Sequence, residues 1–194
     1  FPILGRSSSG PLQYIDGFAG PGEYEAGEPG SPIIALQVVA GHSYMPDFTQ
    51  ARRRVEFLFV EKERSFEAHL QQKVFGTVWP SCFNIEIKPG EFESVMVNLL
   101  DEVDTAHRRL PPTLLFIDPF GSAGFSMELL ARLAHHFRID VLINFNYVDL
   151  VRWILPDEAK HVVLNRLYGG ESWLPALLLV GDDRKDFLIH EYGL

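Results

Sequence analysis

The residues best suited to chemistry form a glycine-rich run near the amino terminus. The run is Asp16-Gly17-Phe18-Ala19-Gly20-Pro21-Gly22, and it closes an apolar segment that begins at Leu12. Clustered glycines let a backbone turn tightly and approach a ligand closely. Taken alone, the glycines also fit a Gly/Pro surface turn. Asp16 favours a binding loop, because a carboxylate at the end of a buried strand needs a partner.

The spacing of this run argues against a dinucleotide fingerprint. The pattern G-x-G-x-x-G would need a glycine at position 25, where the sequence has Glu25, and it would open directly into a helix. Here we expect the helix to begin only at about Ser31, so a pyrophosphate held at a helix N-terminus does not fit. A cationic sulfonium suits the acidic residues along the loop better. These are Asp16, Glu23, Glu25 and Glu28. We therefore expect S-adenosylmethionine as the cofactor, with Ser31 at the end of its loop.

Acidic residues also follow the second and third apolar segments. Glu61 comes directly after the second, where a carboxylate can accept both hydroxyls of a ribose. An ordinary solvated charge is the alternative, and Lys62 beside it belongs to the same expected site. Glu91 follows the third segment, next to Gly90. The Glu91 carboxylate offers a hydrogen-bond acceptor for an adenine, and Gly90 allows the adenine to approach the backbone closely. Acids at this position also stabilise the first turn of a helix through its dipole.

The fourth apolar segment is followed by Asp118-Pro119-Phe120-Gly121. Asp118 can accept a hydrogen bond from a substrate amine, and Phe120 can stack on a planar substrate. An Asp-Pro turn is the alternative, which we disfavour because the residues follow a buried strand. Polar residues that follow the fifth segment indicate a pocket lined by polar side chains. They are Asn144, Asn146, Tyr147, Asp149 and Arg152. The alternative is that Arg152 simply pairs with Asp149 at helical spacing.

Five apolar segments with helical patterns between them indicate an α/β fold. Four of the five are nearly continuous apolar runs, as in parallel strands buried on both faces. The predicted strands are Leu12–Phe18, Val55–Val60, Phe83–Ile87, Thr113–Ile117 and Val141–Phe145. Alternating strands and helices predict a doubly wound, mostly parallel sheet. Such a sheet binds its ligand at the carboxyl ends of its strands, where the candidate residues lie.

Helix signals accompany these strands. Ser31 is predicted to be an N-cap with Pro32 in the first turn, and Gly41 can end that helix. Apolar stripes predict two further helices. One stripe is Phe66, Leu70 and Val74, and the other is Phe92, Met96, Leu99, Leu100, Val103 and His107. Ser126 is predicted to cap the next helix.

The remaining segments define the predicted domain organisation. We expect a single domain over residues 1–194, with a polar surface insertion at about 41–54 and a helical extension at about 153–170. The extension includes a helix over Pro156–Tyr168 that ends at Gly169. The strand character of Phe187–Ile189 predicts a further antiparallel hairpin beyond Leu194, so that the C-terminal strands of the sheet would lie outside this chain.

The composition limits the classes of function. A net charge of −9, from 17 Lys and Arg against 26 Asp and Glu, disfavours a broad nucleic-acid surface, although it leaves room for a small local site. The single Cys82 excludes a disulfide framework and cannot by itself supply a cysteine metal site, and the histidines show no metal-ligand spacing. No apolar run reaches the roughly 18 residues of a membrane span. We therefore expect a cytoplasmic protein without a bound metal.

Three motifs together resemble the three-Cys-motif partner protein family, called TcmP. They are Tyr14-Ile15-Asp16-Gly17-Phe18-Ala19-Gly20-Pro21-Gly22, Gly30-Ser31-Pro32 and Phe116-Ile117-Asp118-Pro119-Phe120-Gly121. The resemblance extends through Asn144 and Arg152 to Leu164–Gly169. It implies a prokaryotic, Rossmann-like fold of the class I methyltransferase type. It also implies a partner encoded nearby, with three clustered cysteines similar to those that hold an iron–sulfur cluster.

The resemblance leaves the methyl acceptor open. Position 118 is similar to the amine-methylating motif of adenine methyltransferases, an Asp or Asn followed by two prolines and an aromatic residue. This sequence has one proline and Phe120 in place of the second, which argues against base N-methylation. Three functions follow as expectations: methyl transfer to an amine or nucleobase, a non-catalytic cofactor-binding scaffold or specificity subunit for the three-cysteine partner, and a nucleic-acid-modifying component of a mobile-element or defence system.

Overall fold

The computed structural model describes residues 10–119, 124–136, 138–154 and 158–193 of the chain. The chain divides into two compact units. The first comprises Phe1–Asp118 and His136–Ile143, and the second Pro119–His135 and Asn144–Leu194. No helix in the described ranges is long and apolar enough to cross a membrane.

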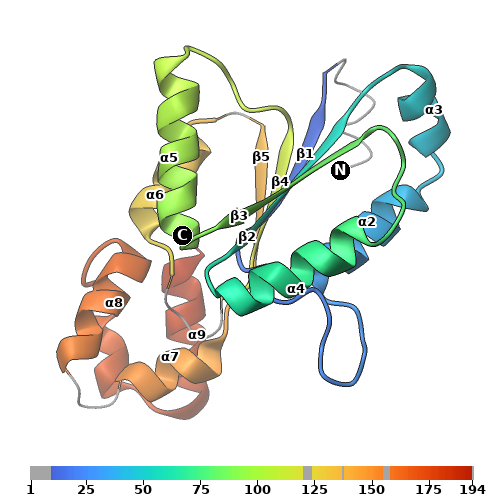
Figure 1. Ribbon diagram of the computed structural model, residues 1–194. Coiled ribbons are helices and arrows are strands. Elements are labelled where there is room, and N and C mark those ends of the chain that lie inside the picture. The colour runs from blue at the N-terminus through green and yellow to red at the C-terminus, as the bar shows by residue number, and fades with distance from the viewer. Residues whose placement is uncertain (1–9, 120–123, 137, 155–157, 194) are drawn as a thin grey trace. The chain divides into compact units, whose positions relative to one another are not determined.

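The described residues of the first unit form a five-stranded sheet in which every neighbouring pair is parallel (Figure 1). The strands are β1 (Leu12–Asp16), β2 (Val55–Glu61), β3 (Phe83–Pro89), β4 (Thr113–Ile117) and β5 (Ile139–Ile143). Their order is β3-β2-β1-β4-β5. This confirms the predicted α/β class and gives a Rossmann-like sheet. The order reverses between β1 and β4, so β1 is the middle strand and β4 lies between β1 and β5.

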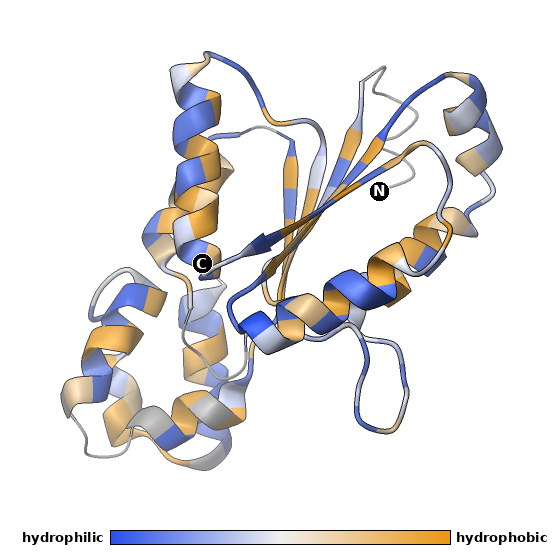
Figure 2. Ribbon diagram, in the orientation of Figure 1, coloured by the Kyte–Doolittle hydropathy of each residue, from blue (hydrophilic) through white to orange (hydrophobic). Residues whose placement is uncertain are grey.

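Helices cover both faces of this sheet. The helices of the first unit are α2 (Ser31–Ala40), α3 (Met45–Gln50), α4 (Arg64–Phe75) and α5 (Phe92–Thr105). Figure 1 shows α2 and α4 on one face and α5 on the other. The core on the α2 and α4 face includes Leu36, Phe57, Phe59 and Leu70, all at most 1% exposed. Figure 2 shows apolar residues concentrated in the strands and bands of polar and apolar residues along α4 and α5.

The strand predictions are correct in place and differ at some ends. β4 has the predicted bounds, whereas β2 and β3 each extend two residues or fewer further, to Glu61 and Pro89. β1 ends at Asp16, because the chain turns away into the glycine run. The prediction for β5 was wrong by two residues, since the strand pairs Ile139 with Thr113 and ends at Ile143. Apolar residues lie on both sides of the strand end, since Phe145 follows Asn144, so composition alone does not mark that end.

Four predictions outside the strands also need correction. Gly30, not Ser31, is the N-cap of α2, and Ser31 uses its hydroxyl elsewhere. Residues 41–54 are not a purely polar insertion, because they contain α3, which buries Met45 and Phe48. Phe66 is 42% exposed, although its predicted partners on α4 are buried. Leu99 is half-buried and His107 lies beyond the end of α5, exposed.

The second unit is helical in the described ranges. Its helices are α6 (Met127–Ala134), α7 (Tyr147–Ile154), α8 (Glu158–Tyr168), the 3-10 helix η1 (Leu174–Leu178) and α9 (Gly181–Tyr192). The predicted cap of α6 is confirmed, since Ser126 Oγ accepts the Leu129 N–H at 3.2 Å. The predicted strand Phe187–Ile189 was wrong: these residues lie in α9, where only Leu188 is buried. The proposed hairpin after Leu194 loses this support.

The motif Leu164–Gly169 has a structural role in this unit. Asn165 Oδ1 accepts the indole N–H of the fully buried Trp173 at 2.8 Å, and the Tyr168 hydroxyl donates to the Leu188 carbonyl oxygen at 3.1 Å. Gly169 ends α8 in a left-handed conformation with φ of 70°. The motif therefore connects α8 to η1 and α9. Pro156, the first residue of the predicted helix, lies outside the described residues.

Candidate functional site

Three acidic side chains lie at the edge of the sheet where the site is expected. Asp16 and Glu61 are the last residues of β1 and β2, and Asp118 follows β4 directly. Because these strands are parallel, their carboxyl ends lie at the same edge. The switch in strand order falls between β1 and β4, which is where a doubly wound sheet leaves a crevice for a ligand.

The glycine run bridges the two sides of this switch. The Gly17 N–H donates to the Phe116 carbonyl oxygen of β4 at 2.9 Å. Two residues later, the Ala19 N–H donates to the Val60 carbonyl oxygen of β2 at 3.0 Å. The backbone after β1 therefore crosses from the end of β4 to the end of β2 within three residues. This places the run across the carboxyl ends of the strands.

The Asp16 side chain stabilises this part of the backbone through hydrogen bonds. This side chain is completely buried; Oδ1 accepts the Phe18 N–H at 3.1 Å and Oδ2 accepts the Ser31 hydroxyl at 2.6 Å. The pKa of Asp16 is raised to about 6, chiefly because the side chain is buried; the hydrogen bonds from Ser31 and Phe18 act to lower it, and the nearby Asp118 and Glu61 charges act to raise it. With no exposed surface, Asp16 shapes the loop and joins it to the start of α2.

Glu61 holds the outer part of the loop. Its Oε2 accepts the Gly20 N–H at 2.7 Å, and its Oε1 accepts the Glu63 N–H at 2.7 Å. The Glu61 residue is 8% exposed. The Glu61–Gly20 bond joins residues 41 positions apart, and no local pattern in the sequence indicates it.

The glycines of the loop differ in how much space surrounds the position of a Cβ atom. Gly22 has φ of 82°, and a Cβ there would meet Leu70 Cδ1 at 2.8 Å. Gly30 lies so close to Gly22 that its N–H donates to the Gly22 carbonyl oxygen at 2.8 Å and a Cβ would meet Gly22 backbone at 3.0 Å. Gly20 has φ of 62°, and among the described residues other than its two chain neighbours no atom lies within 4 Å of the Cβ position. The base of the loop is therefore tightly packed, whereas the backbone at Gly20 faces open space.

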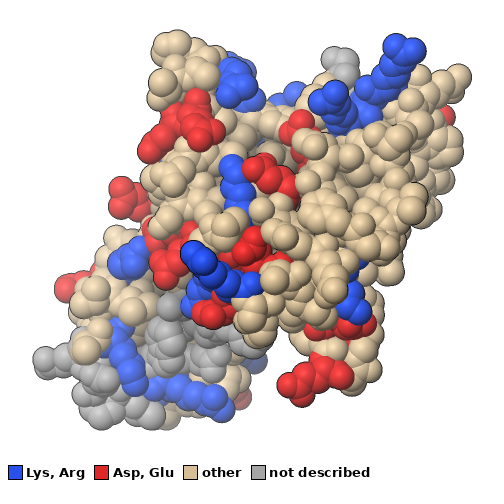
Figure 3. Space-filling model, viewed as in Figure 1, with Lys and Arg blue, Asp and Glu red and all other residues tan. Residues whose placement is uncertain are grey.

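The acidic residues of the loop do not gather at one point. Residues 23–29 form a small hairpin closed by a bridge between Glu23 and Pro29. Glu23 forms an ion pair with Lys73 of α4, and Glu25 and Glu28 are exposed. In Figure 3, Asp and Glu side chains are visible on the loop that projects past α2 and α4 in Figure 1. Only Asp16 of the four acids lies beneath the glycine run.

The other candidate residues have varied surroundings. Lys62 and Glu91 are exposed, and Glu91 is the N-cap of α5, which fits the helix-dipole alternative. Phe18 packs on Phe92, the first residue of α5, with ring centroids 5.4 Å apart. Asp118 is half-buried and has an interaction partner. Phe120 lies outside the described residues.

Pro119 and the candidates that follow β5 belong to the second unit. Pro119 is buried, and Asn144 and Asn146 are exposed. Each asparagine has an interaction partner. Within the described parts of the chain, no group of three or more His, Cys, Asp or Glu side chains is placed to hold a metal ion.

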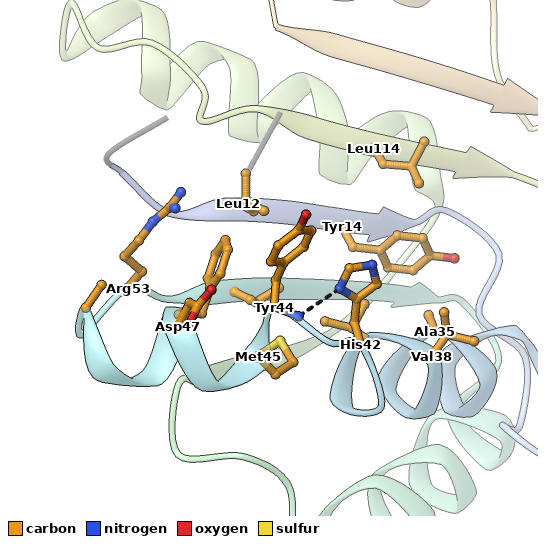
Figure 4. A pocket seen from close by; sticks show the side chains of 14 residues that line it. Leu12, Tyr14, Ala35, Val38, His42, Tyr44, Met45, Asp47, Arg53 and Leu114 are labelled. Atoms are coloured by element: carbon orange, nitrogen blue, oxygen red, sulfur yellow. Dashed lines mark hydrogen bonds between the residues drawn. The ribbon is translucent and has the colours of Figure 1, made fainter. Parts of the chain in front are cut away.

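A ligand-sized cavity lies elsewhere in the first unit (Figure 4). It has a volume of about 630 Å³ and shares no lining residue with the glycine run or Glu61. Figure 4 shows Tyr14 and Tyr44 extending into the space between β1 and the helices α2 and α3, with Arg53 at one end. This cavity was not predicted from the sequence, because residues 41–54 were interpreted as a polar insertion. The apolar Met45 and Phe48, three residues apart, were the available signal.

Comparisons with known proteins add nothing to this geometry. No protein-family model matches the chain, and no curated protein matches it either. The residues at the carboxyl ends of β1, β2 and β4 are therefore the basis for proposing a function.

Proposed function

We propose that the protein binds S-adenosylmethionine at the carboxyl ends of β1 and β2 and acts as a methyltransferase of the class I type. One observation supports this most directly: the Gly20 N–H meets the Glu61 carboxylate at 2.7 Å, so the glycine loop and the acid after β2 form one site. The site lies beside the switch in strand order, where sheets of this kind bind nucleotides.

The residues present fit such a cofactor. The backbone at Gly20 faces open space in the described structure, so a ligand can approach it closely. Each carboxylate oxygen has two lone pairs, and each Glu61 oxygen accepts one N–H in the described structure, which leaves acceptor capacity for two ribose hydroxyls. Glu61 would therefore hold the ribose, and the run Gly17–Gly20 would lie against the rest of the cofactor.

Methyl transfer requires little from the chain beyond orientation and exclusion of water. When bound, S-adenosylmethionine supplies an electrophilic methyl group. Asp118, at the end of β4 across the switch from β2, would position the acceptor through a hydrogen bond to its amine. The acceptor class favoured by this carboxylate is an amine or a nucleobase amine.

Calorimetry with S-adenosylmethionine, S-adenosylhomocysteine and NAD tests the binding proposal. The two adenosyl ligands should bind, and NAD should bind much more weakly. Glu61→Ala should weaken adenosyl binding about tenfold or more, since hydrogen bonds to charged groups contribute about 1.5–3 kcal/mol. Glu63→Ala is the matched control, because the Glu63 side chain is exposed and two residues away. Absence of heat and of a thermal shift with either adenosyl ligand would refute the proposal.

A second candidate function is a cofactor-binding scaffold for a three-cysteine partner. The observation in its favour is that a ligand-sized cavity of 630 Å³ in the first unit shares no lining residue with the glycine run. A scaffold would bind S-adenosylhomocysteine without transferring methyl groups to any component of a cell extract. Transfer of labelled methyl groups by the protein alone would exclude this candidate.

A further inference from the structure

We infer that Glu61 has a second role, in which its carboxylate fixes the Gly20 peptide and so links the shape of the loop after β1 to recognition of the ribose. The ribose half of this inference rests on the proposed function. The loop half rests on contacts within the first unit and is testable without any ligand.

The position of the Glu61 carboxylate is fixed from both sides. Its backbone is held by β3, since the Gly90 N–H donates to the Glu61 carbonyl oxygen at 3.0 Å. Its side chain is held by the Glu63 N–H, at the start of α4. The acceptor that meets Gly20 is therefore held by contacts that do not involve the loop.

Gly20 depends on this acceptor. Its φ of 62° turns the chain into the left-handed region, directly after the Ala19 N–H has bonded to Val60. The Gly20 N–H then points to Glu61 Oε2, at a distance typical of a charge-assisted bond. Beyond Gly20, the Pro21 carbonyl oxygen lies 3.0 Å from His69 Nδ1 of α4, and the chain is anchored again through the packed pair Gly22 and Gly30.

A neutral amide cannot replace this carboxylate. A glutamine side chain has one acceptor oxygen and one NH₂ donor. In either orientation, the NH₂ group would face a backbone N–H, that of Gly20 or that of Glu63. Glu61→Gln therefore breaks one of the two bonds and places two donors together, with almost no change in volume. It separates the carboxylate's role from simple packing.

Hydrogen exchange on the ligand-free protein tests the loop half. In Glu61→Gln, amides in residues 17–23 should exchange at least tenfold faster than in the wild type, with α4 unchanged. Glu63→Gln removes the same charge from an exposed side chain two residues away, and it should leave both regions unchanged. Glu61→Ala removes both acceptor oxygens, so equal exchange of residues 17–23 in Glu61→Ala and wild type overturns the inference. The wild type alone gives a second test, since an unprotected Gly20 amide in NMR exchange would also overturn it.

Two ligands test the ribose half: S-adenosylhomocysteine and its 2′,3′-dideoxy analogue. If Glu61 also positions the loop, Glu61→Gln should weaken both ligands at least threefold. If Glu61 only contacts the ribose, the variant should weaken S-adenosylhomocysteine and leave the analogue unaffected, which overturns the coupling. Failure of the wild type to bind either ligand, together with faster exchange in Glu61→Gln, would refute the proposed cofactor and support the loop role.

Discussion

Asp16 is a buried acid whose ionisation works against the folded state. Its pKa is about 6 in the folded protein against 3.8 in the unfolded chain, so the ionised form is disfavoured by burial. A raised carboxyl pKa contributes stability that is present below about pH 4 and is lost as the pH rises through 6. The shift of about 2 pKa units corresponds to about 3 kcal/mol.

Replacing Asp16 by Asn should remove this pH dependence. Between pH 4 and pH 7, the free energy of unfolding of Asp16→Asn should rise relative to wild type by up to about 3 kcal/mol, measured by urea denaturation at both values. Ser31→Ala is the companion variant. It removes a hydrogen bond that lowers the Asp16 pKa, so its stability should depend more steeply on pH than that of the wild type. An offset between Asp16→Asn and wild type that is the same at both pH values would contradict the assignment.

Asp118 is the residue whose replacement tests the proposed methyl transfer separately from cofactor binding. If it positions the acceptor, Asp118→Ala should abolish methyl transfer and leave S-adenosylhomocysteine affinity within about threefold, because the expected cofactor contacts lie at the glycine run and Glu61. The acceptor for this assay comes from a cell extract screened with labelled cofactor. Asp118→Asn, which keeps one acceptor oxygen, should lose less. Undiminished transfer by Asp118→Ala rules out the role, and loss of both binding and folding makes Asp118 structural.

The loop between β1 and α2 is an element whose shape is fixed by packing at its base. Gly22→Ala would put a Cβ 2.8 Å from Leu70 Cδ1 at a φ of 82°, so both steric overlap and backbone strain oppose it. Left-handed strain costs about 1–2 kcal/mol and overpacking about 1–3 kcal/mol, so we expect about 2–4 kcal/mol of lost stability in urea denaturation.

Gly41→Ala is the matched control for this prediction. Gly41 has φ of −80° and its Cβ would lie 3.4 Å from the nearest atom, the Gln37 carbonyl oxygen. That variant should stay within about 0.5 kcal/mol of wild type. A similar loss in both variants would show that the loop base is not specially constrained.

Strands were easiest to predict where both of their faces are buried. The strands β1, β2 and β4 lie in the interior of the sheet, and their continuous apolar runs reveal burial on both faces. β5 is at an edge, with Val141 40% exposed and Leu142 57% exposed, and its bounds were misplaced. Phe187–Ile189 has the composition of a strand, but α9 buries only Leu188 and leaves Ile189 45% exposed. Short apolar runs do not distinguish a strand from one face of a helix.

At the scale of the whole molecule, the predicted cofactor residues all belong to the first unit. Ser31 and Glu61 lie outside the glycine run in the sequence, yet the Ser31 hydroxyl donates to Asp16 of the run and Glu61 accepts the Gly20 N–H. Cofactor binding is therefore expected to be a property of this unit. The second unit owes its order to buried aromatic residues, such as Trp173 and Tyr168, each of which satisfies its polar atom.

The sequence by itself determined the class of the fold and the edge of the sheet at which the candidate residues lie. Apolar runs alternating with helical patterns predict a parallel sheet, and parallel strands must bring their carboxyl ends together. Glycines and acids placed just after those runs are therefore assigned to one edge without knowledge of strand order. This inference needs only local patterns and the direction of the chain.

Only the tertiary structure decided which atoms meet at that edge. It placed β1 between β2 and β4, gave the Ser31 hydroxyl to Asp16 in place of a helix cap, and joined Glu61 to the Gly20 peptide. These contacts link residues 15 and 41 positions apart. A side chain's partner at such separations depends on how strands pack, and the pattern of neighbouring residues carries no record of it.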